Sequence, residues 1–557
     1  MIENNNRNKI FWLAYIYLIV LILIRFIPII NPESRTWGFN HLIFLPDIYN
    51  YVFFAIASLA LVIPFINSSE KAGEKLTNWF SDKFIDGRHR YLYRFVFIAI
   101  MTSLFAIFTA PTHFLGDGYR VIENLGTEMG MLTKWSEIGI LGVMWSIREL
   151  LGPPDKETAL LAFQVVSIFS GAVTIYFIFL IAKIASENNL KRFIVFTTAT
   201  FSGGMLLFFG YAEYYPVVWV LMSGLIYFGL KYLRYSRGLF LTWLFLIIGI
   251  ILHVQMSVFI PAVIYLSFAN GKGLNFYNRF KIIIWSVFAL LFVSCLLFLI
   301  NEYTTNLAVE DIFLPLYNGK PASPEYAILS LPHLLDIINE LILLSPLLFL
   351  LLLMAGNNIR NIFKYKTAIF TGLGAGGSLL FMFVIDPKIG FPRDWDLFSL
   401  AGLSLMLFAV TLFKNNNLQY FKRLIISIAM ILSIYSVPFL LTSLNIKASE
   451  KYIESLIDLD MERSQSSITI LTGYYRENGY KDKFDSITAV WNREFMEDRY
   501  ISSAFKAIVA GDLEEAKKFV KLIKPNKFNA DYLRFLAMYY IKVGRLELAL
   551  DNINKAI

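Results

Sequence analysis

The sequence predicts an all-α, polytopic membrane helix bundle followed by a small helical domain, and three observations lead to this fold class. Hydrophobic residues make up 57% of the 557 residues and charged residues only 17%, a composition unlike that of a soluble domain. The apolar residues are grouped in runs long enough to cross a bilayer as helices. Beyond residue 444 these runs stop, and a period of about 33 residues begins.

Apolar runs of spanning length predict about 13 membrane helices. The first run, residues 10–30, follows Arg7 and Lys9 and lacks a small-residue cleavage site, so we interpret it as a retained span and not as a signal peptide. The pair at 239–269 and the run at 342–354 are short for a full crossing. The runs cover residues 10–30, 46–66, 93–113, 159–182, 193–209, 216–233, 239–252, 254–269, 282–300, 342–354, 367–386, 396–413 and 424–443.

Basic residues in the loops predict the orientation in the membrane, because Lys and Arg are enriched in cytoplasmic loops. The loop after the second run is basic and is expected in the cytoplasm with the N-terminus; its residues are Lys71, Lys75, Lys83, Arg88, Arg90 and Arg94. Alternation then predicts further inner loops, and each is basic: Lys183, Lys191 and Arg192; Lys231, Arg234 and Arg237; Lys272, Arg279 and Lys281; Arg360, Lys364 and Lys366; Lys414, Lys422 and Arg423. The chain beyond residue 444 is therefore expected outside a bacterial inner or plasma membrane.

These patterns divide the chain into three predicted parts. Residues 1–92 hold two spans and a basic cytoplasmic loop, and residues 93–443 form the main membrane domain with outer loops at 113–158 and 301–341. Residues 444–557 form an extracytoplasmic domain that resembles tetratricopeptide repeats. In that domain Gly511-Asp512-Leu513-Glu514-Glu515-Ala516 recurs as Gly544-Arg545-Leu546-Glu547-Leu548-Ala549, Ala504 matches Ala537, and Gly479 holds the glycine position of a weaker upstream copy. Stacked helical hairpins of this kind offer a concave surface to a protein partner.

Composition also excludes several kinds of site. Cys295 is the single cysteine, so a disulfide within the chain is impossible, and the five histidines lack the spacings of zinc sites. We predict no cofactor; a divalent cation stays open, although no spacing supports one. The net charge of +8 comes mostly from short loops between spans, so it indicates membrane orientation and not nucleic-acid binding.

Residues 111–120 form the first of four polar segments expected on the outer face. Asp117 lies where a span ends and a wet loop begins, and a partly desolvated carboxylate there is a suitable base for an alcohol. The alternative is that Gly116-Asp117-Gly118 is simply a turn. Arg120 and Glu123 follow it, and residues 135–151 are expected to form an amphipathic helix on the membrane surface.

The other three outer segments also carry charge close to apolar runs, which marks a site or a pathway. They are residues 210–216 with Glu213, residues 253–255 with His253, and residues 386–396 with Arg393, Asp394 and Asp396. Each has an alternative: a solvated acid among interfacial tyrosines for Glu213, a helix cap for His253, and an ion pair with Asp394 or Asp396 for Arg393. The glycines within residues 372–377 lie in an apolar run, so we expect close helix packing there and no nucleotide loop.

Three of these segments together resemble the C-type superfamily of membrane glycosyltransferases, which includes protein O-mannosyltransferases and aminoarabinose transferases. The matching motifs are Gly116-Asp117-Gly118-Tyr119, the link at residues 210–216, and Phe391-Pro392-Arg393-Asp394-Trp395-Asp396. The resemblance covers roughly residues 93–443. With its repeat-like tail the chain is also similar to membrane O-mannosyltransferases that carry appended tetratricopeptide units.

The resemblance implies an inverting transfer of a sugar from a polyprenyl phosphate in the bilayer to a hydroxyl of a protein, glycan or lipid acceptor. It implies Asp117 as the base and Arg393, with Arg120 in reserve, as the ligand of the donor phosphate, since a guanidinium binds phosphate through two hydrogen bonds. The implied supporting residues, which bind sugar or acceptor or orient other groups, are Glu213, His253, Asp394, Asp396, Tyr119 and Glu123.

Two functions from other classes remain open at this point. A transporter or flippase for a lipid-linked sugar needs polar residues at mid-membrane depth, often in broken helices. A non-catalytic scaffold that holds the tail at the membrane needs neither Asp117 nor Arg393. The scaffold would tolerate changes at both residues and would lose its function with the tail.

Overall fold

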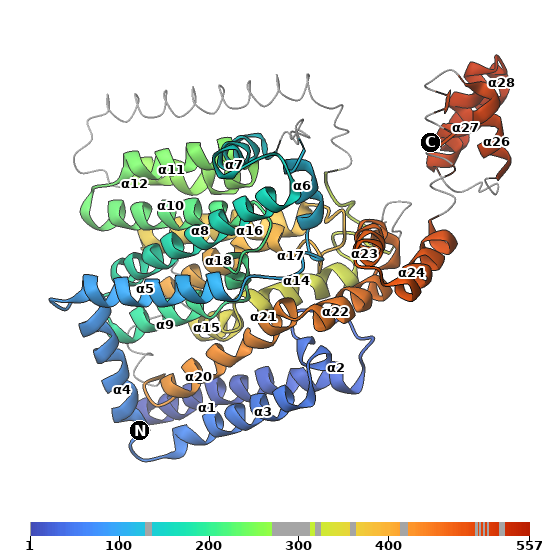
Figure 1. Cartoon of the computed structure of the whole chain (residues 1–557). Helices are drawn as coiled ribbons and strands as arrows, with labels where there is room; N and C mark the ends of the chain where they lie inside the picture. The colour runs from blue at the N-terminus through green and yellow to red at the C-terminus, as the bar shows by residue number, and fades with distance from the viewer. Residues whose placement is uncertain are drawn as a thin grey trace, which may run out of the picture. The chain divides into compact units, whose positions relative to one another are not determined.

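The computed structural model shows a helical protein, as the sequence predicts (Figure 1). The described residues are 2–127, 136–269, 312–317, 325–356, 364–412, 421–495, 500, 503–504, 507–508, 512–522 and 530–556. Within these ranges the chain forms helices and no β-strand beyond one isolated bridge between Phe313 and Ile385. The predicted all-α class is therefore confirmed for the described part of the chain.

The chain divides into two compact units. The first comprises residues 1–314 and 331–459, and the second comprises residues 315–330 and 460–557. This differs from the predicted parts, because residues 1–92 are not a separate unit and the second boundary lies after residue 459 instead of 443. Helix α22 (Ile446–Leu459) belongs to the first unit and buries one face there, including Tyr452 and Leu456.

Among the described residues, eight helices are long and apolar enough to span a membrane: Lys9–Ile30, Asp47–Phe65, Arg90–Ile107, Lys156–Ala185, Tyr215–Tyr235, Lys366–Val384, Trp395–Leu412 and Ile425–Leu444. A ninth candidate consists of α14 (Leu331–Leu344) and α15 (Leu348–Ala355), which meet at a bend of 96°. The membrane-protein class follows from these helices. The expected total of about 13 spans is not confirmed.

Three differences account for the smaller number. The run at 193–209 is broken into α9 (Asn189–Thr200) and the 3-10 helix η5 (Gly203–Phe208), because the Ser202 hydroxyl accepts the Gly204 N–H and starts a new helix. The runs at 239–269 form shorter helices, which are α11 (Leu239–Leu252), η6 (Val254–Phe259) and α12 (Ile260–Ala269). The run at 282–300 lies outside the described residues.

Loops that the sequence assigns to the cytoplasm meet one another at one end of the bundle. Lys183 and Arg192 both pair with Asp86, which follows α4 (Ser69–Phe80) and the π-helix η4 (Ser81–Ile85). Further ion pairs join Arg234 to Glu187 at 2.6 Å and Lys422 to Glu74 at 2.9 Å. The grouping of these loops agrees with the alternation, whereas the side of the membrane on which they lie stays a prediction.

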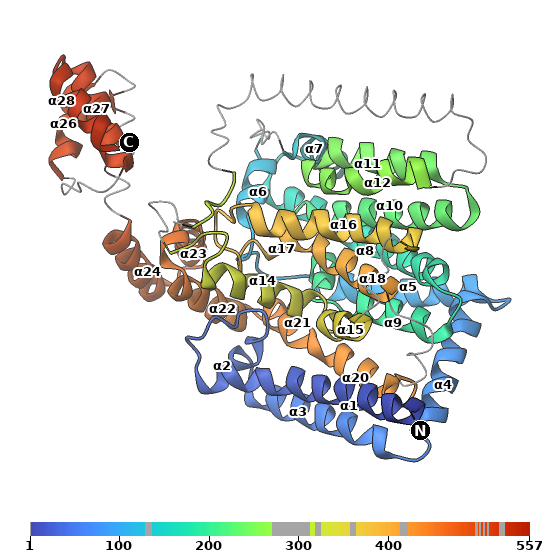
Figure 2. The same ribbon diagram turned by 180° about the vertical axis from the view of Figure 1, so that it is seen from behind.

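The N-terminal helices α1 (Ile2–Leu23) and α3 (Asp47–Val62) run beside α20 (Ile425–Tyr435), which continues through α21 (Val437–Leu444) (Figures 1 and 2). The short helix α2 (Ile27–Ile30) follows α1. The loop between α2 and α3 is fastened to α14 by buried polar contacts. Arg35 donates two hydrogen bonds to Asp336, at 2.8 and 3.2 Å, and the Trp37 indole N–H donates to the same carboxylate at 2.8 Å. These contacts tie the first two spans to the rest of the unit.

We expect Asp336→Ala to destabilise the protein by about 3–5 kcal/mol, because it leaves the Arg35 guanidinium and the Trp37 N–H without their buried acceptor. Thermal unfolding of the purified protein in detergent measures the effect. Glu33→Ala, an exposed acid in the same loop, is the control that leaves the melting temperature unchanged. A melting temperature of Asp336→Ala equal to that of the wild type would show that the hydrogen bonds of Asp336 to Arg35 and Trp37 do not stabilise the fold.

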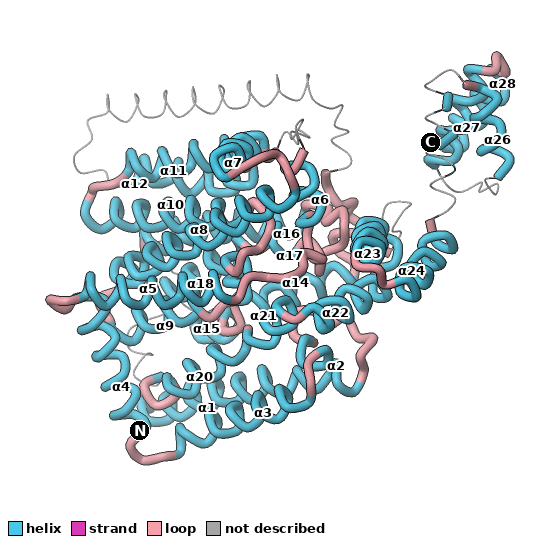
Figure 3. The backbone as a smooth tube through the Cα atoms, viewed as in Figure 1, coloured by secondary structure: helices cyan, strands magenta, loops and turns pink. Residues whose placement is uncertain are grey.

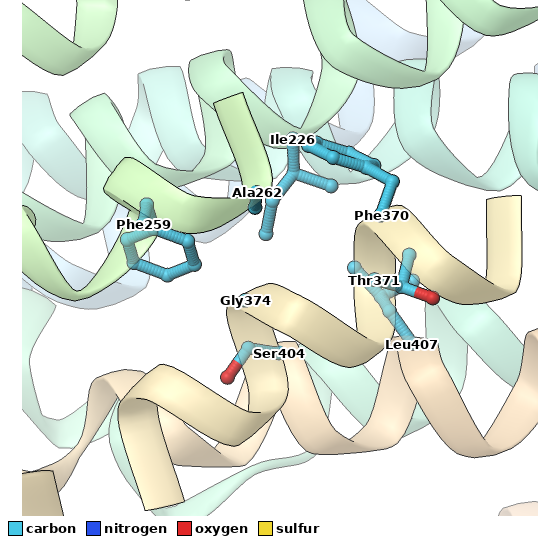
Figure 4. A pocket seen from close by; sticks show the side chains of 8 residues that line it. All are labelled: Ile226, Phe259, Ala262, Phe370, Thr371, Gly374, Ser404 and Leu407. Atoms are coloured by element: carbon cyan, nitrogen blue, oxygen red, sulfur yellow. The ribbon is translucent and has the colours of Figure 1, made fainter. Parts of the chain in front are cut away.

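The centre of the unit is built from α8 (Lys156–Ala185), α10 (Tyr215–Tyr235), α16 (Lys366–Val384) and α18 (Leu400–Leu412), with α5 (Arg90–Ile107) against α8. The predicted role of the α16 glycines is confirmed at Gly377, where an added Cβ would lie 2.2 Å from the Val258 carbonyl oxygen. Close packing leaves a cavity of about 10 Å³ bounded by Ile226, Phe259, Phe370 and Leu407 (Figure 4), room for about one water molecule.

The second unit contains α23 (Gln465–Glu477), α24 (Lys481–Glu494), α26 (Leu513–Leu522), α27 (Ala530–Lys542) and α28 (Leu546–Ala556). Gly479 and Gly544 adopt positive φ angles of 71° and 78° at the turns of the α23–α24 and α27–α28 hairpins. A left-handed residue at a helix end favours glycine, which has no Cβ to clash. The repeated alanines are buried, among them Ala504, Ala516 and Ala537.

Candidate functional site

Loops gather around α6 (Gly118–Leu125) and α17 (Trp395–Phe398) at one end of the bundle (Figure 3). Residues of these loops line a cavity of about 650 Å³ in the first unit. All four polar segments contribute to its lining: Asp117 from the first; Glu213, Tyr214 and Tyr215 from the second; His253, Val254 and Gln255 from the third; and Asp386, Lys388, Ile389, Asp394 and Asp396 from the fourth. The volume is in the range of small-molecule binding sites. Segments far apart in the sequence therefore meet at one site.

Asp117 sits on a tight turn at the start of α6 and is half-buried. Two backbone hydrogen bonds hold this turn: the Gly116 N–H donates to the Arg393 carbonyl at 2.7 Å, and the Asp117 N–H donates to Glu213 Oε1 at 2.6 Å. The stretch is thus the turn that the alternative interpretation expected. It also places the Asp117 carboxylate on the cavity wall.

Gly116 allows two other acids to approach this turn. Its φ angle is +67°, and an added Cβ would lie 2.5 Å from Glu213 Oε1 and 2.8 Å from Asp396 Oδ2. Both distances are shorter than any ordinary contact of a carbon atom. The missing side chain is therefore what lets the carboxylates of the second and fourth segments converge beside Asp117.

The second segment is buried, so the interpretation of Glu213 as a solvated loop acid is wrong: its exposed fraction is 5%. Tyr214 lies beside it. Burial, together with the carboxylates of Glu137, Glu213 and Asp117, raises the pKa of the Tyr214 phenol well above its usual 10. The phenol consequently keeps its proton and is available as a hydrogen-bond donor at the acidic end of the cavity.

His253 caps a helix and also lines the cavity. Its Nδ1 accepts the Gln255 N–H at 3.3 Å at the start of η6, as the helix-cap interpretation expected. In a neutral imidazole the proton then resides on Nε2, and this nitrogen lies 4.0 Å from Glu137 Oε1. This separation is longer than a hydrogen bond, so His253 and Glu137, the residue before α7 (Ile138–Leu151), are neighbours on the cavity wall.

The fourth segment supplies most of the charge. Asp396 is 1% exposed, and its Oδ1 accepts the Leu397 N–H at 2.9 Å. Lys388 reaches Asp386 at 3.4 Å, and the lysine side chain is 55% exposed whereas the aspartate is buried. Lys388 therefore keeps its charge partly in solvent at the edge of an otherwise acidic cavity.

The remaining predicted site residues lie elsewhere. Arg393 is fully buried, and its guanidinium donates from Nη1 to the Leu456 carbonyl at 2.7 Å and from Nε to the Ile389 carbonyl. Arg120 and Glu123 are exposed, Glu123 lying 3.9 Å from Lys156. The Tyr119 ring packs on His113 and Phe114. None of the four lines the cavity where the structure describes it, and these positions give no support to Arg393 or Arg120 as phosphate ligands.

Sequence reasoning did not select Glu137, Asp386 or Lys388, although all three line the cavity. A signal for two of them was present, since Asp386 and Lys388 directly follow an apolar run in the same way as Asp117 does. Glu137 lies within the first turn of the predicted amphipathic helix at residues 135–151 and directly precedes the observed α7. That helix forms as α7, but it packs Ile140 and Met144 against α6 and α8.

One wall of the cavity is apolar. It consists of Val258 and Pro261 from η6 and α12 and of Leu380, Phe381 and Val384 from α16. Leu380 is 63% exposed, so this wall continues to the surface of the described part of the unit. An acidic end and an apolar wall together suit an amphiphilic ligand. Within the described residues, no group of three or more histidine, cysteine or acidic side chains is arranged to hold a metal ion.

His113, behind the Asp117 turn, gives the folded protein a predictable acid sensitivity. Burial lowers the pKa of its imidazole from 6.5 to about 4. Between these pH values the unfolded chain binds a proton at His113 and the folded chain does not, so stability falls as the pH decreases through this window. We expect His113→Gln to remove about 3 kcal/mol of the stability difference between about pH 7 and pH 4.

Thermal unfolding of both proteins across this pH range measures the effect. On acidification, the melting temperature of the wild type should fall further than that of His113→Gln. Equal losses in the two proteins would show that His113 is protonated in the folded state.

Comparison of the chain with protein-family models, curated proteins and solved structures finds no match.

Proposed function

We propose that this protein is an inverting membrane glycosyltransferase that moves a sugar from a polyprenyl phosphate to an acceptor hydroxyl on the extracytoplasmic face. The observation that supports it most is the cavity itself. Carboxylates from three of the four polar segments, together with Glu137, line the cavity, and one wall is apolar and extends to the surface. A lipid-linked sugar has the same two parts, a hydroxyl-rich head and a hydrocarbon chain.

In the proposed reaction, Asp117 accepts the proton of the acceptor hydroxyl. The hydroxyl oxygen attacks the anomeric carbon from the face opposite the phosphate, the bond from that carbon to the phosphate oxygen breaks, and the lipid phosphate leaves with the electron pair. The configuration at the anomeric carbon is thereby inverted. The N–H of Asp117 is anchored on Glu213 at 2.6 Å, which orients the carboxylate relative to the cavity.

We assign the donor phosphate to Lys388 and not to Arg393. Lys388 lines the cavity with a partly exposed ammonium group, whereas the Arg393 guanidinium is buried and bonded to carbonyl oxygens. A lysine ammonium binds phosphate as a point charge. Lys388 would exchange part of its contact with Asp386 for the phosphate oxygens and so steady the leaving group.

Lys388→Met is therefore expected to raise the KM for the lipid donor about 10- to 100-fold, as loss of one charged contact of about 1.5–3 kcal/mol implies. Initial rates at varied donor concentration measure it. Lys156→Met, an exposed lysine outside the cavity, serves as the matched control. A donor KM unchanged by Lys388→Met would exclude this lysine as the phosphate ligand.

The remaining carboxylates have a supporting role in this proposal. In the proposed complex Glu213, Asp394 and Asp396, which line the cavity, accept hydrogen bonds from sugar hydroxyls, and the Tyr214 phenol donates one. His253, which also lines the cavity, contacts the sugar or the acceptor. In the second unit, we propose that the hairpins are tetratricopeptide-like and bind an acceptor or a partner protein.

A second candidate function is transport of the same lipid-linked sugar. It is favoured by the break of 96° between α14 and α15 and by Glu340, a fully buried carboxyl on α14. Buried acids near broken helices are typical of transporter sites. Movement of a labelled lipid-linked sugar across proteoliposomes without release of lipid phosphate would indicate transport, and release of lipid phosphate only with an acceptor would indicate transfer.

The experiment that tests the proposal supplies purified protein with a panel of radiolabelled polyprenyl-phosphate sugars and a membrane extract as the acceptor source. Transfer of label from at least one donor by the wild type supports the proposal. Absence of transfer from every donor, in folded protein, contradicts it. A scaffold function predicts the same absence, together with loss of a binding partner when the second unit is removed.

A further inference from the structure

Arg393 connects the Asp117 turn with α22, and both connections are direct hydrogen bonds. Its backbone carbonyl accepts the Gly116 N–H at 2.7 Å, while its guanidinium donates to the Leu456 carbonyl at 2.7 Å. The side chain is fully buried. The main chain of Arg393 thus holds the peptide group next to Asp117, and its side chain binds α22.

A second hydrogen bond joins the same two segments independently. The Thr112 hydroxyl donates to the Ser449 hydroxyl of α22 at 2.9 Å, and both residues are buried. The segment that leads to Asp117 is therefore attached to α22 at Thr112 and, through Arg393, at Gly116. Glu213 adds a third attachment at the Asp117 N–H.

The conformation of this turn has little freedom to adjust. Gly116 has a positive φ angle, and the space where its Cβ would lie is occupied by oxygen atoms of Glu213 and Asp396. A shift of the Arg393 carbonyl would therefore move Gly116 against these carboxylates or release its N–H. Since reaction rates fall steeply when reacting groups are misplaced by about 1 Å, the placement of Arg393 has a direct consequence for Asp117.

We infer that Arg393 is a positioning residue, through which α22 holds the Asp117 turn in the geometry that the transfer reaction needs. The guanidinium acts on the turn and not on the donor. The expected effect of Arg393 on the transfer rate rests on the proposed function, whereas its effect on the conformation of the turn does not. Helix α22 ends at Leu459, and the next residue, Asp460, begins the C-terminal part of the second unit.

Arg393→Lys distinguishes a role of Arg393 in positioning the turn from a role that depends only on its positive charge. It keeps a positive charge, but a single ammonium group cannot reproduce the two hydrogen bonds that the guanidinium makes to Ile389 and Leu456. Hydrogen exchange of the full-length protein in detergent, followed by mass spectrometry, reports on the amides of residues 114–118. We expect exchange there to become about tenfold faster, the change that loss of one buried hydrogen bond implies.

The kinetic readout distinguishes this role from a donor ligand. With the transferase assay, Arg393→Lys should lower kcat and leave the donor KM unchanged, and Lys447→Met, an exposed residue of α22, should change neither. A raised donor KM with an unchanged kcat would instead assign Arg393 to the phosphate. Exchange at residues 114–118 equal to that of the wild type, in a folded Arg393→Lys protein, would also overturn the inference.

If Arg393→Lys does not fold, the double variant Thr112→Val with Ser449→Ala tests whether α22 positions the turn, at the second hydrogen bond between them. It removes both partners of that hydrogen bond and leaves no unpaired group. Faster exchange at residues 114–118 supports positioning of the turn by α22, and unchanged exchange rejects it. Should the wild type transfer no sugar, the proposed function fails, and the exchange rates still decide whether α22 positions the turn.

Discussion

Asp117→Asn should abolish most of the sugar transfer, lowering kcat by about 10²- to 10⁴-fold, because asparagine has the shape of aspartate but accepts no proton from the acceptor. The backbone contact to Glu213 involves the N–H of residue 117 and not its side chain, so the turn is retained. The measurement is transfer of radiolabelled sugar under saturating donor. A melting temperature equal to that of the wild type confirms that the loss is chemical.

The matched control is Glu157→Gln, which neutralises an exposed acid in the first turn of α8 and should leave the rate unchanged. Transfer by Asp117→Asn at the rate of the wild type would remove Asp117 as the base. A base elsewhere in the cavity, such as Glu137, would then be the next residue to replace.

Gly116→Ala should lower the transfer rate about 100-fold without unfolding the protein, as displacement of a reacting group by about 1 Å implies. The added methyl group would enter the space of Glu213 Oε1 and Asp396 Oδ2, at 2.5 and 2.8 Å, and the positive φ angle of residue 116 also disfavours alanine. The turn must shift, and Asp117 shifts with it. Steady-state rates together with a melting curve measure both parts of the expectation.

Gly142→Ala is the control for this substitution, because nothing lies within 4 Å of an added Cβ at Gly142 in α7. It should preserve both activity and stability. A fully active Gly116→Ala protein would mean that the convergence of the two carboxylates on this turn has no functional importance.

The fold class and the common location of the four polar segments were predictable from the sequence, because both depend on patterns that hydropathy and charge reveal. A span ends where the apolar run ends, so Asp117, Glu213, His253 and Asp396 were identifiable as charges or polar groups at span ends. Alternation of the helices then brought their loops to one end of the bundle. The cavity in which all four lie agrees with this reasoning.

The direction of each side chain was not predictable, because neighbouring residues in a loop point to different sides. Arg393 and Asp394 are adjacent, yet the first is buried against α22 and the second lines the cavity. Lys388 and Arg393 carry the same charge in the same segment, and only the three-dimensional structure distinguishes their surroundings. The charge and spacing of the sequence therefore identified residues 386–396 as a polar segment, whereas the packing of the fold determines which of its side chains line the cavity.

The hydropathy of the sequence also did not predict where helices begin and end. The run at 193–209 is apolar throughout, but Ser202 caps a new helix within it. Helix α22 was predicted as part of the outer domain because the last apolar run of spanning length ends at residue 443, whereas one face of the helix, with Tyr452 and Leu456, is buried in the first unit. Both differences arise from contacts with distant residues, which a local pattern does not contain.

Photo-crosslinking with a polyprenyl phosphate that carries a diazirine beside its phosphate tests whether this cavity binds a lipid-linked donor. We expect labelled peptides within residues 253–261 and 377–389, the segments that supply the apolar wall and Lys388. Unlabelled polyprenyl phosphate should compete, and Lys388→Met should weaken the labelling. Labelling confined to other segments, or labelling of these peptides that competitor does not reduce, would show that the donor does not bind in this cavity.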